Sequence, residues 1–118
     1  MEKHTLDLSD LDSVRSFAGE LSGLDHIDVL VNNAGLVRDE RDETAQGFEM
    51  VFGTTHLGHF LLTDELLEQV RASDNGRIIN VASRAAFRGD TPEYMTYAAS
   101  KGGVVALTRS IARAYGKD

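Results

Sequence analysis

Two short runs of apolar, mostly β-branched residues, each followed by a long segment with helical spacing, constrain the fold of this chain most strongly. The first run lies within IDVLVNNAG (27–35) and the second within RIINVAS (77–83). Continuous apolar strands this short are typical of a sheet that is covered on both faces. Strands that alternate with helices predict βαβ units with right-handed crossovers, and therefore a parallel sheet.

Three helices and one further strand are predicted by periodicity and by turn residues. HTLDL (4–8) has the pattern of a short strand end, and Ser9 with Asp12 is expected to cap the helix that follows. We expect helices over about 10–22, over 44–71 with a break near Gly53, and over 94–115, with a loop over 84–93. The sequence thus predicts one α/β domain over residues 1–118, with three strands and flanking helices.

Composition and charge exclude several classes of function. The 118 residues carry a formal net charge of −7 and no basic cluster, which argues against nucleic acid and an anionic membrane surface as partners. There is no cysteine, which excludes disulfides, thiolate metal sites and cysteine nucleophiles. The apolar runs are far shorter than the roughly 18 residues that span a bilayer, and the polar N-terminus is unlike a signal peptide. We therefore expect a cytoplasmic protein with no membrane partner.

Tyr97 and Lys101 stand four residues apart in YAASK (97–101), on one face of a predicted helix. Side chains at this spacing lie roughly 5–6 Å apart, and an ammonium that close favours the charged form of a phenol. A tyrosine so activated can exchange a proton with a substrate oxygen near neutral pH. The alternative is a core aromatic residue beside a solvated surface charge. Because this spacing arises by chance about once in five chains of this length, the motif alone does not decide.

Small and polar residues collect where the three predicted strands end. They are Asp7 and Leu8, the segment NNAG (32–35), and Ser83. In open parallel sheets, ligands bind outside the carboxyl ends of the strands. The sequence therefore places a binding site at this edge of the predicted sheet.

Four motifs in one order resemble those of the short-chain dehydrogenase/reductase family. They are DLSD (7–10), NNAG (32–35), NVAS (80–83) and YAASK (97–101), and the resemblance extends over all 118 residues. It implies a partial Rossmann-like fold with a doubly wound parallel sheet. It also implies an oxidoreductase that transfers a hydride between NAD or NADP and a small-molecule carbonyl or alcohol. By the family's pattern, the helices near 54–71 and 95–115 would pack in a homo-oligomer.

The resemblance also implies roles for individual residues. Tyr97 matches the acid/base that protonates the carbonyl oxygen, Lys101 matches the residue that activates it and binds the nicotinamide ribose, and Ser83 matches the hydroxyl that holds the substrate oxygen. Thr55 occupies the place of an asparagine that helps to hold a water in the proton path. Besides Tyr97 and Lys101, the residues that match cofactor-binding positions are Asp7, Leu8, Asn32, Ala34 and Gly35.

Several of these residues also have a purely structural interpretation. Ser83 could cap a turn or helix, Asn32 could satisfy backbone groups at a buried strand end, and Asp7 could begin the cap of the next helix. His56 and His59, three residues apart, could suggest a metal pair. No third ligand lies nearby in sequence, so we expect no metal.

The sequence departs from the family pattern in three ways. It lacks the glycine-rich phosphate-binding turn Thr-Gly-x-x-x-Gly-x-Gly, it ends after YGKD (115–118) before the family's further strands and lid, and Thr55 replaces the asparagine. Two functions therefore stay open. The chain is an NAD(P)-dependent oxidoreductase or a fragment of one, or it is a truncated, catalytically silent relative that associates through its long helices.

The branch of the family and the preferred nucleotide are not fixed by these motifs. THLGHFLLT (55–63) resembles the retinol-dehydrogenase side of the family. YAASKGGVVALTRSIA (97–112) resembles the 3-oxoacyl-carrier-protein reductases and the sugar and alcohol dehydrogenases, toward which we lean. The residue that usually selects NAD or NADP follows a strand that these 118 residues do not contain.

Overall fold

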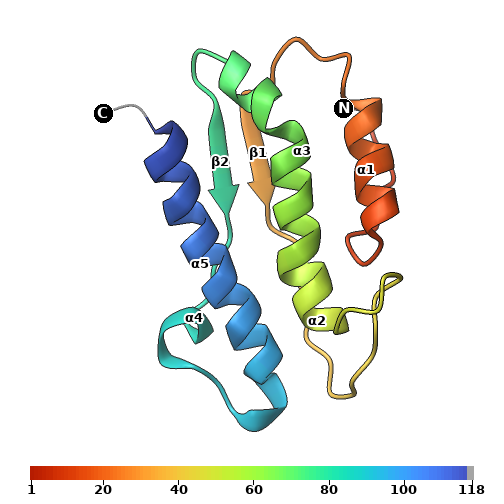
Figure 1. Ribbon diagram of the computed structural model, residues 1–118, viewed down its shortest axis with the longest axis vertical. Coiled ribbons are helices and arrows are strands. Elements are labelled where there is room, and N and C mark those ends of the chain that lie inside the picture. Colours follow the sequence, from red (N-terminus) through yellow and green to blue (C-terminus); the bar gives the residue numbers. More distant parts are fainter. Residues whose placement is uncertain (117–118) are drawn as a thin grey trace.

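The computed structural model describes residues 1–116. In chain order the elements are α1 (Leu11–Glu20), β1 (Val29–Asn32), α2 (Met50–Phe52), the π-helical turn η1 (Gly53–Leu57), α3 (Gly58–Ala72), β2 (Arg77–Asn80), α4 (Ala85–Arg88), the 3₁₀ turn η2 (Pro92–Tyr94) and α5 (Met95–Tyr115). The strands β1 and β2 form a parallel sheet, in which Val29 pairs with Arg77 and Asn32 with Asn80. The helices α3 and α5 lie over one face of this sheet, and α1 packs beside α3 (Figure 1).

The strand predicted over residues 4–8 is wrong. This segment is irregular up to a turn at Leu8 and Ser9, where the Asp10 N–H donates to the Asp7 carbonyl at 3.2 Å. A strand forms only where a neighbour pairs with its backbone, and no ladder reaches this segment within residues 1–116. The observed sheet therefore has two strands instead of three, although the α/β class is confirmed.

The helix α1 is confirmed, but its cap differs from the prediction. Asp10, and not Ser9, caps the helix by accepting from the Asp12 N–H at 3.0 Å. The Ser9 hydroxyl instead donates to the Asp7 carboxylate at 2.6 Å. Because Asp7 engages that hydroxyl, the cap falls to the next polar side chain along the chain.

The predicted helix over 44–71 begins later than expected. Gly47 has a φ of +81°, in the left-handed region that ends helical geometry, and the first helical residue is Met50. The Glu49 carboxylate caps this start by accepting from the N–H groups of Val51 and Phe52 at 3.1 and 2.8 Å. The predicted break near Gly53 is confirmed, as the π-helical turn η1.

The core lies between α1, α3 and one face of the sheet. Its buried members are Leu8, Val14, Ala18, Leu62 and Leu66, with Leu30 of β1 packed against them. The other face of the sheet is exposed and mostly apolar. Val29, Val31, Ile79 and Val81 keep 40–52% of their surface accessible, and Arg77 lies beside Val29 on this face. The expected cover on both faces is therefore wrong for residues 1–116, where helices cover one face.

The C-terminal part of the chain follows the prediction closely. The helix α5 begins at Met95 and ends at Tyr115, and the segment expected as a loop includes the two short turns α4 and η2. Within residues 1–116, no helix combines the length and the apolar character needed to cross a membrane.

Candidate functional site

Three of the predicted residues meet beyond the carboxyl ends of β1 and β2. Lys101 of α5 is 4% exposed, and its Nζ donates to the Val81 carbonyl at 2.7 Å. A Cβ placed on Gly35 would lie 3.7 Å from this Nζ and 3.8 Å from Cγ2 of Thr55. The backbone of the NNAG turn therefore lies directly against both side chains. This is the edge of the sheet at which a ligand site was predicted, because ligands bind outside the carboxyl ends of parallel strands.

Tyr97 and Lys101 share one face of α5, as their spacing predicts. The Lys101 ammonium lies 5.9 Å from the centre of the Tyr97 ring. Burial lowers the pKa of Lys101 below its ordinary value. Among residues 1–116 the ammonium donates to Val81 alone, so two of its three N–H groups remain for another acceptor.

Ser83 lies just after β2, and its structural role is visible. Its Oγ accepts from the N–H of Ala85, the first residue of α4, at 3.2 Å, and α4 packs against α5. The hydroxyl hydrogen stays available to donate. Within the described part of the chain, no hydrogen bond joins Ser83 to Tyr97.

Thr55 is completely buried within η1, and its Oγ1 lies 3.5 Å from the Leu36 N–H, a long hydrogen bond. Its carbonyl accepts from Nδ1 of His59 at 3.0 Å. Burial lowers the pKa of His59, the bond to Thr55 opposes this, and the Lys101 ammonium lowers it further. Because a carbonyl oxygen can only accept, this bond places a proton on Nδ1 of His59. The π-helical turn itself is a feature that often marks functional sites.

Sequence reasoning weighed His59 only as a metal ligand and missed this contact. The signal was present, because Thr55 and His59 are four residues apart on one predicted helix. His56 packs differently: its ring lies 5.3 Å from that of Phe52 and 6.2 Å from that of Phe60. Among residues 1–116 no group of three or more His, Asp or Glu side chains is placed to bind a metal ion.

Asn32 is 5% exposed, and its amide is engaged inside the fold. Its Nδ2 donates to Oγ1 of Thr63 at 2.9 Å and to Oδ1 of Asn80 at 2.8 Å. These contacts are those expected if Asn32 has a structural role at the end of β1. Ala34 and Gly35, in the same turn, are exposed.

Asp7 and Leu8 stand at the start of α1. The Asp7 carboxylate accepts from the N–H and the hydroxyl of Ser9, at 2.9 and 2.6 Å. Leu8 is buried in the core and touches α3, since a Cβ on Gly58 would lie 2.5 Å from the Leu8 carbonyl oxygen. Both residues have local structural partners, and neither is hydrogen-bonded to the group around Lys101 within residues 1–116.

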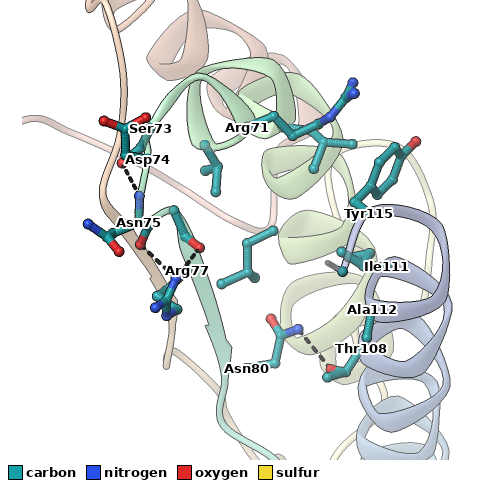
Figure 2. A pocket seen from close by; sticks show the side chains of 15 residues that line it. Arg71, Ser73, Asp74, Asn75, Arg77, Asn80, Thr108, Ile111, Ala112 and Tyr115 are labelled. Carbon is teal, nitrogen blue, oxygen red and sulfur yellow. Dashed lines mark hydrogen bonds between the residues drawn. The ribbon is translucent and has the colours of Figure 1, made fainter. Parts of the chain in front are cut away.

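A groove of about 710 Å³ lies along β2, between the end of α3 and the second half of α5 (Figure 2). Arg71 lies over the ring of Tyr115 at its rim, with 5.0 Å from the guanidinium carbon to the ring centre. The groove extends from the amino end of β2 to Asn80 at its carboxyl end, and Lys101 and Gly35 are not among the residues that line it.

Comparison with known proteins identifies the family. The model of the short chain dehydrogenase family matches residues 2–118. Human retinol dehydrogenase 13 is 42% identical over 121 aligned positions, which cover 92% of this chain and 37% of that protein. Human retinol dehydrogenase 11 is 52% identical over 85 residues, covering 71% of the chain and 27% of that protein. The chain belongs to the short chain dehydrogenase family, and it spans about a third of the length of these curated relatives.

Solved structures agree with the fold. A metagenomic short-chain oxidoreductase in complex with NADP is 30% identical, with a TM-score of 0.78 over 96% of this chain and 52% of that one. An alcohol dehydrogenase from the archaeon Thermococcus sibiricus, complexed with 5-hydroxy-NADP, is 25% identical, with a TM-score of 0.77 over 95% of this chain and 48% of that one. The predicted family and the partial Rossmann-like α/β class are both confirmed.

Proposed function

We propose that this chain carries the proton-transfer site of an NAD(P)-dependent oxidoreductase that interconverts a carbonyl and an alcohol. The observation that supports this most is the buried Lys101 ammonium. It lies beside the Tyr97 ring and against the Gly35 backbone, with two N–H groups uncommitted among residues 1–116. A buried ammonium with unused donors next to a phenol is the arrangement that proton transfer requires.

The residues fit one end of a nicotinamide cofactor. Lys101 offers donors for ribose hydroxyls, and Gly35 leaves room for the close approach of a ligand. The glycine-rich turn that would bind the pyrophosphate is not among the 118 residues. NADP and 5-hydroxy-NADP are bound by the two solved relatives.

In the proposed mechanism, Tyr97 gives its phenolic proton to the oxygen of a carbonyl substrate, and it takes the proton back in alcohol oxidation. Lys101 stabilises the phenolate between these steps, and the Ser83 hydroxyl donates a hydrogen bond to the substrate oxygen. When bound, the nicotinamide supplies or accepts the hydride at carbon. Thr55 and His59 fix the π-helical turn beside Lys101 through the Thr55 carbonyl.

The proposed substrate is an alcohol of the retinol type or its carbonyl counterpart. Relatives at 42% and 52% identity are retinol dehydrogenases, which favours the branch suggested by THLGHFLLT (55–63) over the carrier-protein reductase branch. A cytoplasmic location and assembly as a homo-oligomer are also proposals. Exposed Phe60 on α3 and Met95 on α5 support packing between copies.

A second function, association without catalysis, is favoured by a specific observation. The bare sheet face exposes Val29, Val31 and Ile79 at 50–52%, a contiguous apolar surface that favours contact with another chain. In that case Tyr97 and Lys101 would be inherited residues without a cofactor.

A fluorescence titration of the 118-residue chain with NADPH and, separately, NADH tests the proposal. We expect saturable binding, and in turnover with retinol we expect Tyr97→Phe to lose at least about 100-fold in kcat, because general acid–base catalysis contributes at least that much. Tyr115→Phe makes the same chemical change at the far end of α5 and serves as the matched control. A folded chain that binds neither nucleotide would support association instead.

A further inference from the structure

Four side chains form a continuous path of hydrogen bonds from α3 through both strands to α5. Asn32 Nδ2 donates to Oγ1 of Thr63 and to Oδ1 of Asn80, at 2.9 and 2.8 Å. Asn80 Nδ2 donates to Oγ1 of Thr108 at 2.8 Å, and the Thr108 hydroxyl donates to the Val104 carbonyl at 2.7 Å. The path therefore joins α3, β1, β2 and α5.

The hydrogen bond from the Thr108 hydroxyl to the Val104 carbonyl determines which atom donates in every other bond of the path. Because the hydroxyl hydrogen of Thr108 goes to Val104, its oxygen can only accept, so Asn80 must present its NH₂ group to it. The Oδ1 of Asn80 then faces Asn32, which must present its own NH₂ group. A single arrangement satisfies the path, and it leaves Oδ1 of Asn32 buried without a partner among the described residues.

Two neighbouring residues at the end of β2 contact α5 at points seven residues apart. Asn80 binds Thr108, and the carbonyl of Val81 binds Lys101. Positions i and i+7 of a helix lie on one face, two turns apart. The strand end and the helix are therefore joined by two polar contacts along one line, and one of them is the contact of the buried ammonium.

The contact at Thr108 matters because the packing beyond it is open. Figure 2 shows Asn80 and Thr108 at the border of the groove of about 710 Å³, which separates the second half of α5 from the start of β2. The groove lies between Ile78 of β2 and Ile111 of α5, so the hydrogen bond at its border supplies a directional contact between these two elements. The hydrogen bond is the polar contact that holds α5 to β2 on the groove side of Lys101.

We propose that Asn80 and Thr108 are positioning residues for Lys101: their hydrogen bond sets α5 against the end of β2 so that the ammonium reaches the Val81 carbonyl and stays buried. This inference rests on the proposed function, because it assigns Lys101 its place at the reacting end of the site. The titratable groups that face Lys101 are Tyr97 on its own helix and His59 on α3. No carboxylate of residues 1–116 pairs with it.

The test compares Thr108→Val, which replaces the hydroxyl by a methyl group, with Thr108→Ser, which keeps it. The ionisation of Lys101 is followed by ¹⁵N NMR of the lysine ammonium groups, in a chain that has three lysines. We expect the pKa of Lys101 to rise toward its ordinary value in Thr108→Val, because a displaced helix exposes the ammonium to water. Thr108→Ser should restore the native value.

Ser110→Ala is the matched control. The Ser110 hydroxyl also donates to a carbonyl four residues earlier on α5, that of Ala106 at 3.0 Å, and has no strand partner within residues 1–116. Removal of the Ser110 hydroxyl should leave the pKa of Lys101 at its native value. Thr108 is exposed, so its substitutions should not unfold the chain. The wild-type chain provides a second readout: the side-chain NH₂ of Asn80 should exchange with solvent more slowly than that of exposed Asn75.

The outcomes separate this inference from the proposed function. An unchanged Lys101 pKa in folded Thr108→Val, or exchange at Asn80 as fast as at Asn75, overturns the positioning role whatever the chain binds. A pKa of Lys101 that rises in Thr108→Val but keeps its native value in Thr108→Ser supports the positioning role, even if NADPH does not bind. If NADPH binds, the dissociation constant for Thr108→Val should rise roughly fivefold, as the loss of one hydrogen bond of about 1 kcal/mol predicts.

Discussion

The two faces of the sheet differ in a way that reverses the usual pattern. The face under α3 and α5 presents Leu30 and Ile78 but also two asparagines, Asn32 and Asn80. The bare face presents four exposed apolar side chains, those of Val29, Val31, Ile79 and Val81, with Arg77 beside Val29 at its amino end. Polar groups therefore lie under helices while apolar groups face water.

The difference shows what each face requires from its surroundings. The covered face tolerates asparagines because α3 and α5 supply hydroxyl partners, Thr63 and Thr108, at 2.9 and 2.8 Å. The bare face lacks such partners and has the composition of a surface made for burial. Substitutions on the two sides should therefore have very different costs.

The largest difference should appear when leucine is removed from the covered side. Leu66 of α3 is 1% exposed within the core, so Leu66→Ala should lower the free energy of unfolding by about 2–5 kcal/mol. Ile79→Ala, on the bare face, removes a side chain that is already 50% exposed and should cost less than about 1 kcal/mol. Urea unfolding followed by circular dichroism measures both, and equal losses would mean that the bare face is covered in solution.

A smaller effect is expected where helices approach backbone closely. A Cβ at Gly58 would lie 2.5 Å from the Leu8 carbonyl oxygen, so Gly58→Ala should destabilise the chain by about 1–3 kcal/mol. The control is Gly102→Ala on α5, where a Cβ meets open space and helix propensity should add up to about 1 kcal/mol of stability. A neutral Gly58→Ala in the same thermal unfolding series would contradict the packing of α3 against residues 7–10.

The covered side should also give the chain a pH dependence. Burial lowers the pKa of His59 in the folded state below its ordinary value of about 6.5, so the unfolded state binds a proton first as the pH falls. Stability should therefore decline as the pH falls below 6.5 and be unaffected by this group above it. His59→Gln should reduce the slope of unfolding free energy against pH below 6.5, and His56, whose pKa burial also lowers, should account for part of the slope that remains.

The smallest change in stability is expected for a charge on the bare face. Val31→Lys replaces a side chain that is 52% exposed and pairs with Ile79, so it should alter the free energy of unfolding by no more than about 0.5 kcal/mol. It should nevertheless weaken self-association measured by analytical ultracentrifugation, because a charge disrupts apolar contact. Unchanged association would direct attention to the helices near 54–71 and 95–115.

Local features of the fold could be predicted from the sequence. The apolar spacing of α1 and α5, the break near Gly53 and the two runs that became β1 and β2 all follow from near neighbours in the chain. The late start at Met50 could not be predicted, because it depends on Gly47 adopting a positive φ and on Glu49 turning back as a cap.

The sequence indicated which residues form the candidate site, but it did not predict the hydrogen bonds that they make. The sequence indicated Tyr97, Lys101, Ser83 and the NNAG turn, and the structure brings Lys101, Gly35 and Thr55 together. The hydrogen bonds of Asn32, Asn80 and Thr108 were not predictable, because their partners are 28 to 48 residues apart.

The sequence by itself determined the helices α1 and α5 and the spacing of Tyr97 and Lys101, since each depends on residues within a few turns of one another. It also determined the family, through the order of four short motifs along the chain. Tertiary structure decided whether HTLDL (4–8) would be a strand, which sheet face would be covered and what Lys101 would bind. The physical reason is that a helix satisfies its own backbone, whereas a strand and a buried ammonium need partners from distant parts of the chain.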